Sequence, residues 1–446
     1  MTRPAPRALA LGLAVLVAAT AGWLVTRPSG PRHTAGAAES APPTSGEVAD
    51  AMQLLDRHAS ALLGRDRAGW AAGIDSAGAD AGYAGVERAT FDNLAGVPLT
   101  TWSYVLVAPV TDPAVLTPVA ARLGARVAVL HVQLRYALAR VDPLPTAKDE
   151  WLTLVRRATG WRLAGDGDAQ QDGGASWRGP WAFGPLVTRS GPHTLVLAHP
   201  AQQAELATFA ALVEQSIPVV AGVWGTAWNE QVAVLLPSDT AEFQAVTGDQ
   251  ADSHDLAALA IADSVAPAPD AAGRDAVLGA RIVLNPMNLG RLDAAGRRLV
   301  VQHELTHLAT RAVTDDQMPT WLIEGFADYV GNLDSGRSVP AIAPELAGEV
   351  RGGRLPAALP TAADFDGGDA RLAQVYEESW LACRLVAERI GQHGLVDFYR
   401  TVAADARQDP GTALADGLRA DLHLTPAAFT AAWRGYLSRQ LAGPAG

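Results

Sequence analysis

Two histidines and a glutamate in the second half of the chain have the types and spacing needed for metal chemistry. His303, Glu304 and His307 occur in the run His-Glu-Leu-Thr-His. Apolar residues recur around this run with helical spacing, and Asp293 is placed to cap the start of the helix. Residues four apart share one face of a helix, so both imidazoles can reach the same Zn²⁺. Glu304 would lie beside that ion and act as a general base toward water.

A second helix is predicted to supply a further ligand. The segment 319–329 reads Pro-Thr-Trp-Leu-Ile-Glu-Gly-Phe-Ala-Asp-Tyr, and its proline suits the first position of a helix. Glu324 would then project toward the first helix, and Asp328, four residues later, would share its face. A carboxylate there could accept the ring N–H of a metal-bound histidine and fix its orientation. The prediction is one Zn²⁺ per chain, held by His303, His307 and Glu324, with a fourth position left for water.

The combination of HELTH and WLIEGFADY resembles the gluzincin zinc metallopeptidases, which include the M1 aminopeptidase-like and thermolysin-like families. Within that clan it is most similar to the bacterial peptidase MA-like proteins. The resemblance implies peptide-bond hydrolysis, with the two histidines and Glu324 as zinc ligands. It also assigns Glu304 as the general base and Asp328 as the supporting carboxylate.

The same resemblance implies two features outside the two motifs. A tyrosine on a later helix stabilises the oxyanion, and Tyr376, at the start of a predicted helix that ends near residue 390, is the candidate; a packed aromatic residue is the rival interpretation. A short strand ahead of the metal helix pairs with extended substrate, and 280–284 matches by position. The run Gly-Ala-Arg-Ile-Val at 279–283 lacks the Gly-x-Met-Glu-Asn motif of the aminopeptidase branch. Endopeptidase and exopeptidase activity therefore both stay open.

The residues that precede the motifs predict an α+β protein of two domains. Residues 46–167 favour helices followed by an antiparallel sheet. The predicted helices are 48–63, 68–74 and 86–94, and the predicted strands are 102–107, 126–138, 151–156 and 161–164. This order, ending in the hairpin VRRATGWRL, resembles the NTF2-like (cystatin-like cone) domain. Such a domain would serve dimerisation or substrate docking.

The rest of the chain is interpreted as a linker and the peptidase domain. Residues 168–185 are rich in Gly, Gln and Asp, which is typical of a linker. Residues 186–440 would form the gluzincin domain, with a small mixed sheet and a mainly helical lobe. Strands are expected within 186–198, 231–236 and 280–284, and helices at 201–220 and from residue 293 onward.

The N-terminal segment 1–45 predicts export. Arg3 and Arg7 precede an apolar run from residue 8 to 25, and a linker rich in Pro, Ser and Gly follows. The run fits a signal peptide, with a possible cleavage site at 35–37, or a membrane anchor. The protein is therefore expected outside the cytoplasm, either anchored or secreted. Its single cysteine, Cys383, excludes an intrachain disulfide.

Charge and composition narrow the possible partners. The formal net charge of −12 argues against a general nucleic-acid binder, so the expected partner is a peptide or protein substrate. The alternative is a non-catalytic cell-surface binding protein that retains a structural zinc site. Glu304 favours the enzyme, because a purely structural site does not need a base. The sequence indicates neither the substrate nor the oligomeric state.

Overall fold

The computed structural model divides into two compact units. The N-terminal unit reaches residue 188 and also includes 197–203, and the C-terminal unit comprises 189–196 and the residues from 204 onward. The structure describes residues 40–76, 81–248, 257–266, 276–315, 317–365, 371–409 and 411–442. The predicted signal or anchor within 1–39 lies outside these residues.

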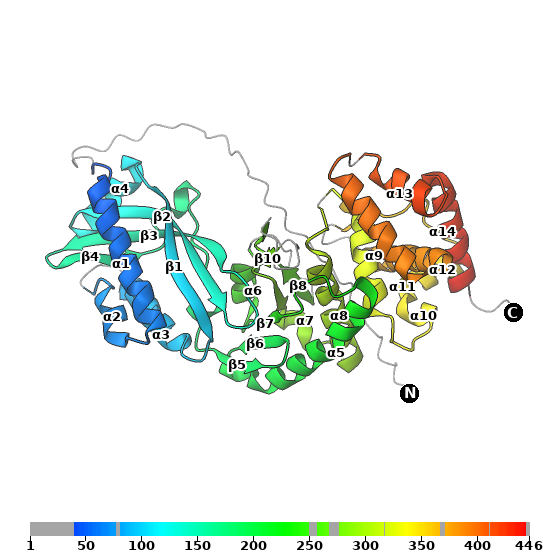
Figure 1. Cartoon of the computed structure of the whole chain (residues 1–446), viewed down its shortest axis with the longest axis horizontal. Helices are drawn as coiled ribbons and strands as arrows, with labels where there is room; N and C mark the ends of the chain where they lie inside the picture. The colour runs from blue at the N-terminus through cyan, green and yellow to red at the C-terminus, as the bar shows by residue number, and fades with distance from the viewer. Residues whose placement is uncertain are drawn as a thin grey trace, which may run out of the picture. The chain divides into compact units, whose positions relative to one another are not determined.

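The N-terminal unit combines helices with a four-stranded antiparallel sheet in the order β1-β2-β3-β4 (Figure 1). Its helices are α1 (Ser45–Leu63), α2 (Arg67–Ala72), α3 (Ala81–Asn93) and α4 (Pro113–Leu123). Its strands are β1 (Leu99–Pro109), β2 (Val127–Leu138), β3 (Thr146–Arg157) and β4 (Gly160–Gly165). Helix α1 packs on the sheet. Three helices followed by strands agree with the predicted element order.

Local sequence explains where these elements start and which faces they bury. Thr44 and Glu47 form a capping box at the start of α1, because each side chain accepts from the other's backbone N–H. Along β2, Leu130, Val132 and Leu134 are buried, as the alternation predicts. Helix α4 was not predicted, because Pro118 interrupts its pattern.

The segment predicted as a linker, 168–185, packs against the sheet. Trp177 stacks on Tyr136 with ring centroids 5.7 Å apart. Trp181 meets Tyr136 and Trp102 edge-on at 5.3 and 5.2 Å, and its carbonyl accepts a hydrogen bond from the Asn93 side chain. Glycine and polar residues suggested a free linker, but the two tryptophans gain more from burial than from exposure to water.

The C-terminal unit contains most of a five-stranded mixed sheet in the order β5-β6-β7-β11-β8. Its strands are β5 (Val187–Ser190), β6 (Thr194–Ala198), β7 (Val232–Leu236), β11 (Arg281–Leu284) and β8 (Ala258–Ile261), and β9 (Ser264–Ala266) and β10 (Ala276–Leu278) form a separate pair. Strand β11 runs parallel to β7 and antiparallel to β8. Helices and strands in both units confirm the predicted α+β class in its coarse form.

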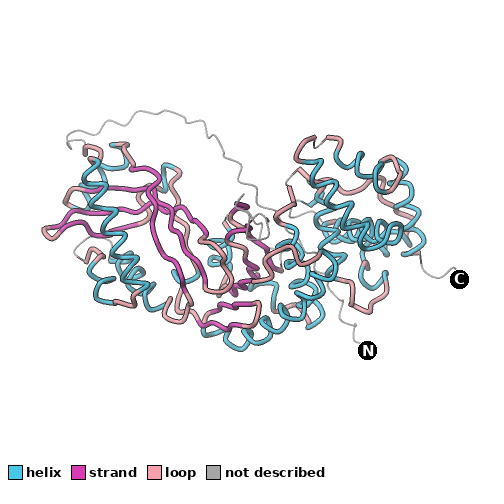
Figure 2. Tube along the Cα trace, in the orientation of Figure 1, coloured by secondary structure: helices cyan, strands magenta, loops and turns pink. Residues whose placement is uncertain are grey.

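Helices supply nearly all of the remaining structure. They are α5 (Leu206–Trp224), α6 (Thr240–Thr247), α7 (Pro286–Leu289), α8 (Ala294–Thr310), α9 (Thr320–Gly331), α10 (Val339–Ile342), α11 (Pro344–Arg351), α12 (Leu372–Ala406), α13 (Ala413–Asp421) and α14 (Pro426–Leu441). Short 3₁₀ turns lie at 170–172, 180–182, 200–205 and 362–365. Figure 2 shows helices and loops in the described part of the chain after β11.

Helices α5 and α9 pack against α8, and α12 packs against α9. Helix α5 is long and apolar enough to cross a membrane, but Phe209, Val213 and Val220 are fully buried and the helix packs on α8. It is therefore built as a core helix. Helix α12 is broken at Gly391, whose φ of 81° and ψ of 166° are not helical. The predicted helix from 376 to 390 ends at this break.

The strand expected to bind substrate, 280–284, is not available for that purpose. It corresponds to β11, which is paired on one side with β7 and on the other with β8. An interior strand has no free backbone groups for an added strand. The expectation is corrected by the topology: the outer strand of this sheet beside α8 is β8.

Candidate metal centre

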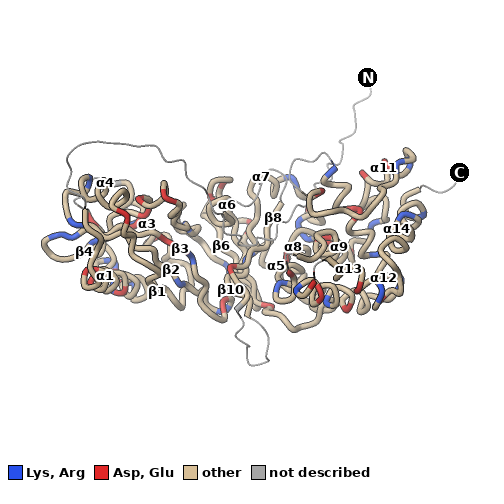
Figure 3. Tube along the Cα trace, turned by 90° about the horizontal axis from the view of Figure 1, so that it is seen from above, with Lys and Arg blue, Asp and Glu red and all other residues tan. Residues whose placement is uncertain are grey.

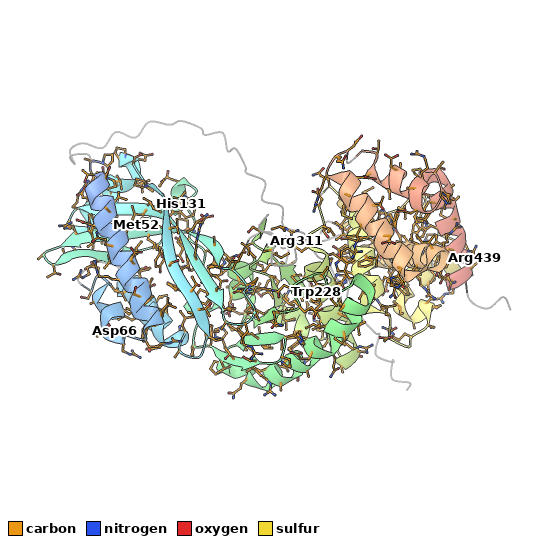
Figure 4. All side chains as sticks on the ribbon, viewed as in Figure 1. Met52, Asp66, His131, Trp228, Arg311 and Arg439 are labelled. Atoms are coloured by element: carbon orange, nitrogen blue, oxygen red, sulfur yellow. The ribbon has the colours of Figure 1, made fainter. Side chains whose placement is uncertain are left out.

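Two packed helices carry the predicted metal ligands. Asp293 caps α8 by accepting a hydrogen bond from the N–H of Gly296 at 2.8 Å, and Arg311 follows the last turn (Figure 4). Helix α9 follows Pro319 directly. The amide of Gln302 on α8 donates to the Val330 carbonyl of α9 at 2.7 Å, which links the helices beside the centre.

The structure brings the side chains of His303, His307 and Glu324 together, with one possible ligand atom from each within 4.8 Å of the others. The two Nε2 atoms lie 2.9 Å apart, and Oε2 of Glu324 lies 3.5 and 3.6 Å from them. Nitrogen ligands at the usual 2.0–2.1 Å from a tetrahedral Zn²⁺ would be separated by about 3.3 Å. The donor set therefore has about the right size for this ion.

Asp328 fixes the orientation of the first histidine. Nδ1 of His303 lies 2.8 Å from Oδ1 of Asp328, and the Asn332 amide donates to the Asp328 backbone carbonyl at 3.0 Å. A carboxylate at Nδ1 favours the tautomer with its proton there, which leaves Nε2 with a lone pair facing the centre. This is the arrangement that the spacing of the two motifs predicted.

The electrostatics of the centre favour a cation. Burial lowers the pKa of His303, but the hydrogen bond to Asp328 and the nearby carboxylate of Glu324 outweigh it and raise the pKa to about 10. Burial raises the pKa of Glu324, yet the imidazoles of His307 and His303 reverse that effect and lower the pKa. Burial also raises the pKa of Asp328, which contact with His303 opposes. Buried carboxylates need a positive partner, which a metal ion supplies.

Unsatisfied buried atoms give a direct test of whether a metal fits. Both carboxylate oxygens of Glu324 are buried and lack a hydrogen-bond donor among the described residues. A buried carboxylate without donors is costly, whereas a metal ligand in this position is satisfied. Two neutral imidazoles and one carboxylate are also the donor types found at catalytic zinc sites. The residues present therefore fit Zn²⁺.

Glu304 lies in the same buried centre but is held differently. Its Oε2 accepts a hydrogen bond of 2.8 Å from the N–H of Ala260, while Oε1 is buried without a partner among the described residues. Burial raises the pKa of Glu304, and the charges of His303 and His307 oppose this shift. One oxygen is thus anchored to β8, and the other is available to a small molecule that enters the centre.

Tyr376, the predicted oxyanion donor, lies on α12 and not on the two helices that carry the predicted metal ligands. It is 4% exposed, and its ring meets Phe365 edge-on at 5.3 Å. Both the catalytic and the packing interpretation are compatible with this position. Its role in catalysis stays a prediction.

Sequence reasoning missed two supports of the centre. The Ala260 N–H that anchors Glu304 belongs to β8, an element that was not predicted. Gly325 follows Glu324 on α9, and a Cβ there would collide with the Ser379 carbonyl of α12 and lie 3.0 Å from Sγ of Cys383. The signal for Gly325 was present, because glycine inside a helix is unfavourable unless packing requires it. For Ala260 the sequence carried no signal, since every residue type except proline supplies a backbone N–H.

Comparison with known proteins yields structural neighbours only. No protein-family profile and no curated protein matches the chain. The chain is similar to an M1 zinc metallopeptidase from Deinococcus radiodurans, with 17% identity and a TM-score of 0.36 over 66% of this chain and 61% of that one. A variant from the same organism, bound to a Tyr-Ser-Ala substrate, has 16% identity and a TM-score of 0.34 over 65% of this chain and 59% of that one. A two-domain M1 zinc metallopeptidase variant bound to L-arginine has 15% identity and a TM-score of 0.33 over 58% of this chain and 52% of that one.

The chain thus spans between about half and three-fifths of the length of these structures. All of the TM-scores are below 0.5 and all of the identities below 20%, so this likeness carries no argument about function. The chemistry of the protein has to be inferred from the side chains of the centre.

Proposed function

We propose that the C-terminal unit is a zinc-dependent peptidase that hydrolyses peptide bonds. The observation that carries this proposal is the convergence of His303, His307 and Glu324 beside a buried Glu304 that is not one of the three. A structural zinc site closes its coordination with four protein ligands and has no use for an extra carboxylate. Three ligands and a base are the composition of a hydrolytic site.

The residues of the centre divide the work of hydrolysis. Zn²⁺, when bound, would polarise a substrate carbonyl and make a water molecule more acidic. Asp328 holds the ring of His303 through Nδ1. Ala260 holds one oxygen of Glu304, so the other, Oε1, is the atom that accepts a proton from water. The same carboxyl group can then return the proton to the leaving amine.

Strand β8 is the element proposed to bind an extended substrate. It is the outer strand of its sheet, and its Ala260 N–H points to Glu304 rather than to β11. A peptide added along this edge would pass the general base. This proposal replaces the strand at 280–284 and leaves endopeptidase and exopeptidase cleavage open.

The decisive experiment compares wild type with Glu304→Gln. The variant keeps the shape of the side chain and the three ligands but cannot accept a proton, so zinc content should be unchanged and cleavage of a diverse peptide library should fall to a trace. Glu349→Gln, a partly exposed change on α11, should cleave as wild type does. Chelation should stop cleavage by the wild type.

Two results would contradict the proposal. Full cleavage by zinc-replete Glu304→Gln would remove the base from the mechanism. Inactivity of wild type and variant on every peptide, with equal thermal stability, would favour the alternative of a binding protein with a structural zinc site.

We further propose that the N-terminal unit is an NTF2-like domain and that the protein acts outside the cytoplasm. Helices before an antiparallel sheet support the first proposal. Arg3, Arg7 and the apolar run after them support the second. The test fuses to the C-terminus a reporter that functions only in the cytoplasm. Reporter activity in the fusion would exclude export.

A further inference from the structure

A pocket in the N-terminal unit lies between α3, β1, β3 and the segment 166–182. The cavity volume is about 60 Å³. The pocket therefore suits a compact ligand group rather than a drug-sized molecule.

Aromatic side chains form much of the pocket wall, and they are Tyr83, Trp102, Tyr104, Trp177 and Trp181. The ring planes of Trp102 and Trp181 meet at 61°, and those of Trp177 and Trp181 at 75°. Rings at steep angles present π-systems in more than one direction, and such systems attract cations. One such cation–π contact occurs within the chain, where Nζ of Lys148 lies 5.0 Å from the centroid of the Trp177 ring.

Three carboxylates line the same pocket, and two of them already have a partner. Asp166 forms two hydrogen bonds of 3.0 Å with Arg178, and Glu87 lies 3.1 Å from Nε2 of His58. Among the described residues, no hydrogen bond or ion pair is made by the carboxylate of Glu150. The positive charge of Lys148, two residues earlier on β3, lies over Trp177 instead.

The carboxyl group of Glu150 therefore has no counter-charge among the described residues. Burial raises its pKa well above the usual range, and repulsion from Glu87 and Asp166 adds to this shift. A carboxyl group in this state gains more than an exposed one from a cation placed beside it. The aromatic walls require that cation to be poorly hydrated, which excludes small inorganic ions and favours an organic one.

We propose that this pocket binds a compact organic ammonium ion, held against the aromatic walls with the Glu150 carboxylate as its counter-charge. Tetramethylammonium and the choline head group have the required size and charge. The proposal is independent of the metal centre, so Glu304→Gln should bind these ions as the wild type does.

Titration of the full chain with tetramethylammonium and choline, followed by calorimetry and tryptophan fluorescence, tests the proposal. Both ions should bind, whereas 3,3-dimethylbutan-1-ol, the neutral analogue of choline, should bind at least tenfold more weakly. Glu150→Gln should weaken choline binding by about thirtyfold or more, because it removes the counter-charge of the bound cation.

Asp149→Asn is the matched control. Asp149 is the next residue on β3 and points to the opposite face. There its carboxylate lies 2.8 Å from Nε2 of His131, which is labelled in Figure 4. Its substitution removes the same charge at nearly the same place in the chain and should leave choline affinity unchanged. An equal loss of choline affinity in both variants would mean that the change in net charge, and not the position of Glu150 in the pocket, causes the loss. That result would overturn the proposal.

The dependence on pH gives an independent readout. The cation stabilises the ionised form of Glu150, so affinity should rise with pH, and this rise should be flattened in Glu150→Gln. The other charged or titratable groups around the pocket are Glu87, Asp166, Arg178, His58, Lys148, Tyr83 and Tyr104. Equal binding of the neutral analogue, an unchanged affinity of Glu150→Gln, or no binding at millimolar concentrations of either ion would overturn the assignment.

Discussion

Asp328 shows how the role of one ligand depends on a residue of another helix. Its carboxylate lies 2.8 Å from Nδ1 of His303, and its backbone carbonyl accepts a hydrogen bond from the Asn332 amide. We predict that Asp328→Asn binds zinc about 10–100-fold more weakly, because the amide offers a donor as readily as an acceptor and no longer fixes the ring. A competition titration with a zinc chelator measures this change.

The control for that measurement is Asp334→Asn. Asp334 is exposed and follows α9, so its loss removes a nearby negative charge without touching the histidine. Its zinc affinity should equal that of the wild type. An Asp328→Asn variant with wild-type affinity would mean that the orientation of His303 is set by packing alone.

Tyr376 has two rival roles, oxyanion donor and packed aromatic residue. If it donates to the oxyanion, Tyr376→Phe should lower kcat by about a hundredfold or more while the free energy of unfolding changes little. Tyr329→Phe, on the ligand helix, should leave kcat unchanged. Peptide cleavage rates measured beside urea unfolding separate the two roles, and unchanged turnover in Tyr376→Phe would assign the residue to packing.

At the scale of elements, the position of Glu324 depends on how closely α9 approaches α12. Gly325 makes that approach possible, since any Cβ would meet the Ser379 carbonyl and Cys383. Gly325→Ala should therefore destabilise the protein by about 1–3 kcal/mol through overpacking. The displaced helix should also lower zinc occupancy.

A second glycine provides the matched comparison. Gly222 lies inside α5, and a Cβ there would meet nothing within 4 Å. Gly222→Ala should stabilise the protein by about 0.5–1 kcal/mol, because alanine loses less conformational entropy in a helix. Chemical unfolding and metal analysis of both variants test the pair. Equal stability changes would show that the contact between α9 and α12 adapts to the extra atom.

At the scale of the whole molecule, the charged residues are distributed differently from the metal centre, which lies in the C-terminal unit. Basic and acidic residues are both spread over the two units in Figure 3. The buried carboxylates of the centre all belong to the C-terminal unit. Metal removal should thus act on one unit and spare the other.

We predict two calorimetric transitions, of which only that of the C-terminal unit responds to zinc. Free zinc at a hundredfold excess over Kd contributes about 2.7 kcal/mol, which corresponds to a Tm shift of about 5–10 °C for a unit of this size. Leu55→Ala, a buried change in α1, identifies the N-terminal transition by lowering it alone. A chelator that shifts both transitions equally, or neither, would contradict this prediction.

The sequence by itself determined the features that depend on short-range geometry. The four-residue spacing of His303 and His307, and of Glu324 and Asp328, fixes shared helix faces before any tertiary contact forms. The alternation along 127–138 likewise fixed which side of β2 would be buried. Local periodicity was sufficient in each case, because the neighbours of these residues are set by the helix or strand itself.

Only the tertiary structure decided which distant segments meet. Nothing in 258–261 indicated that the Ala260 N–H would anchor Glu304, because every residue type except proline offers the same donor. Strand 280–284 was recognised correctly as a strand, but its interior place depends on pairing with two segments that are remote in sequence. Glu150 is likewise unremarkable in a strand. It becomes part of the wall of an aromatic pocket only when α3 and the segment 166–182 close around it. Pairing and burial of this kind depend on the whole chain, which periodicity within one element cannot report.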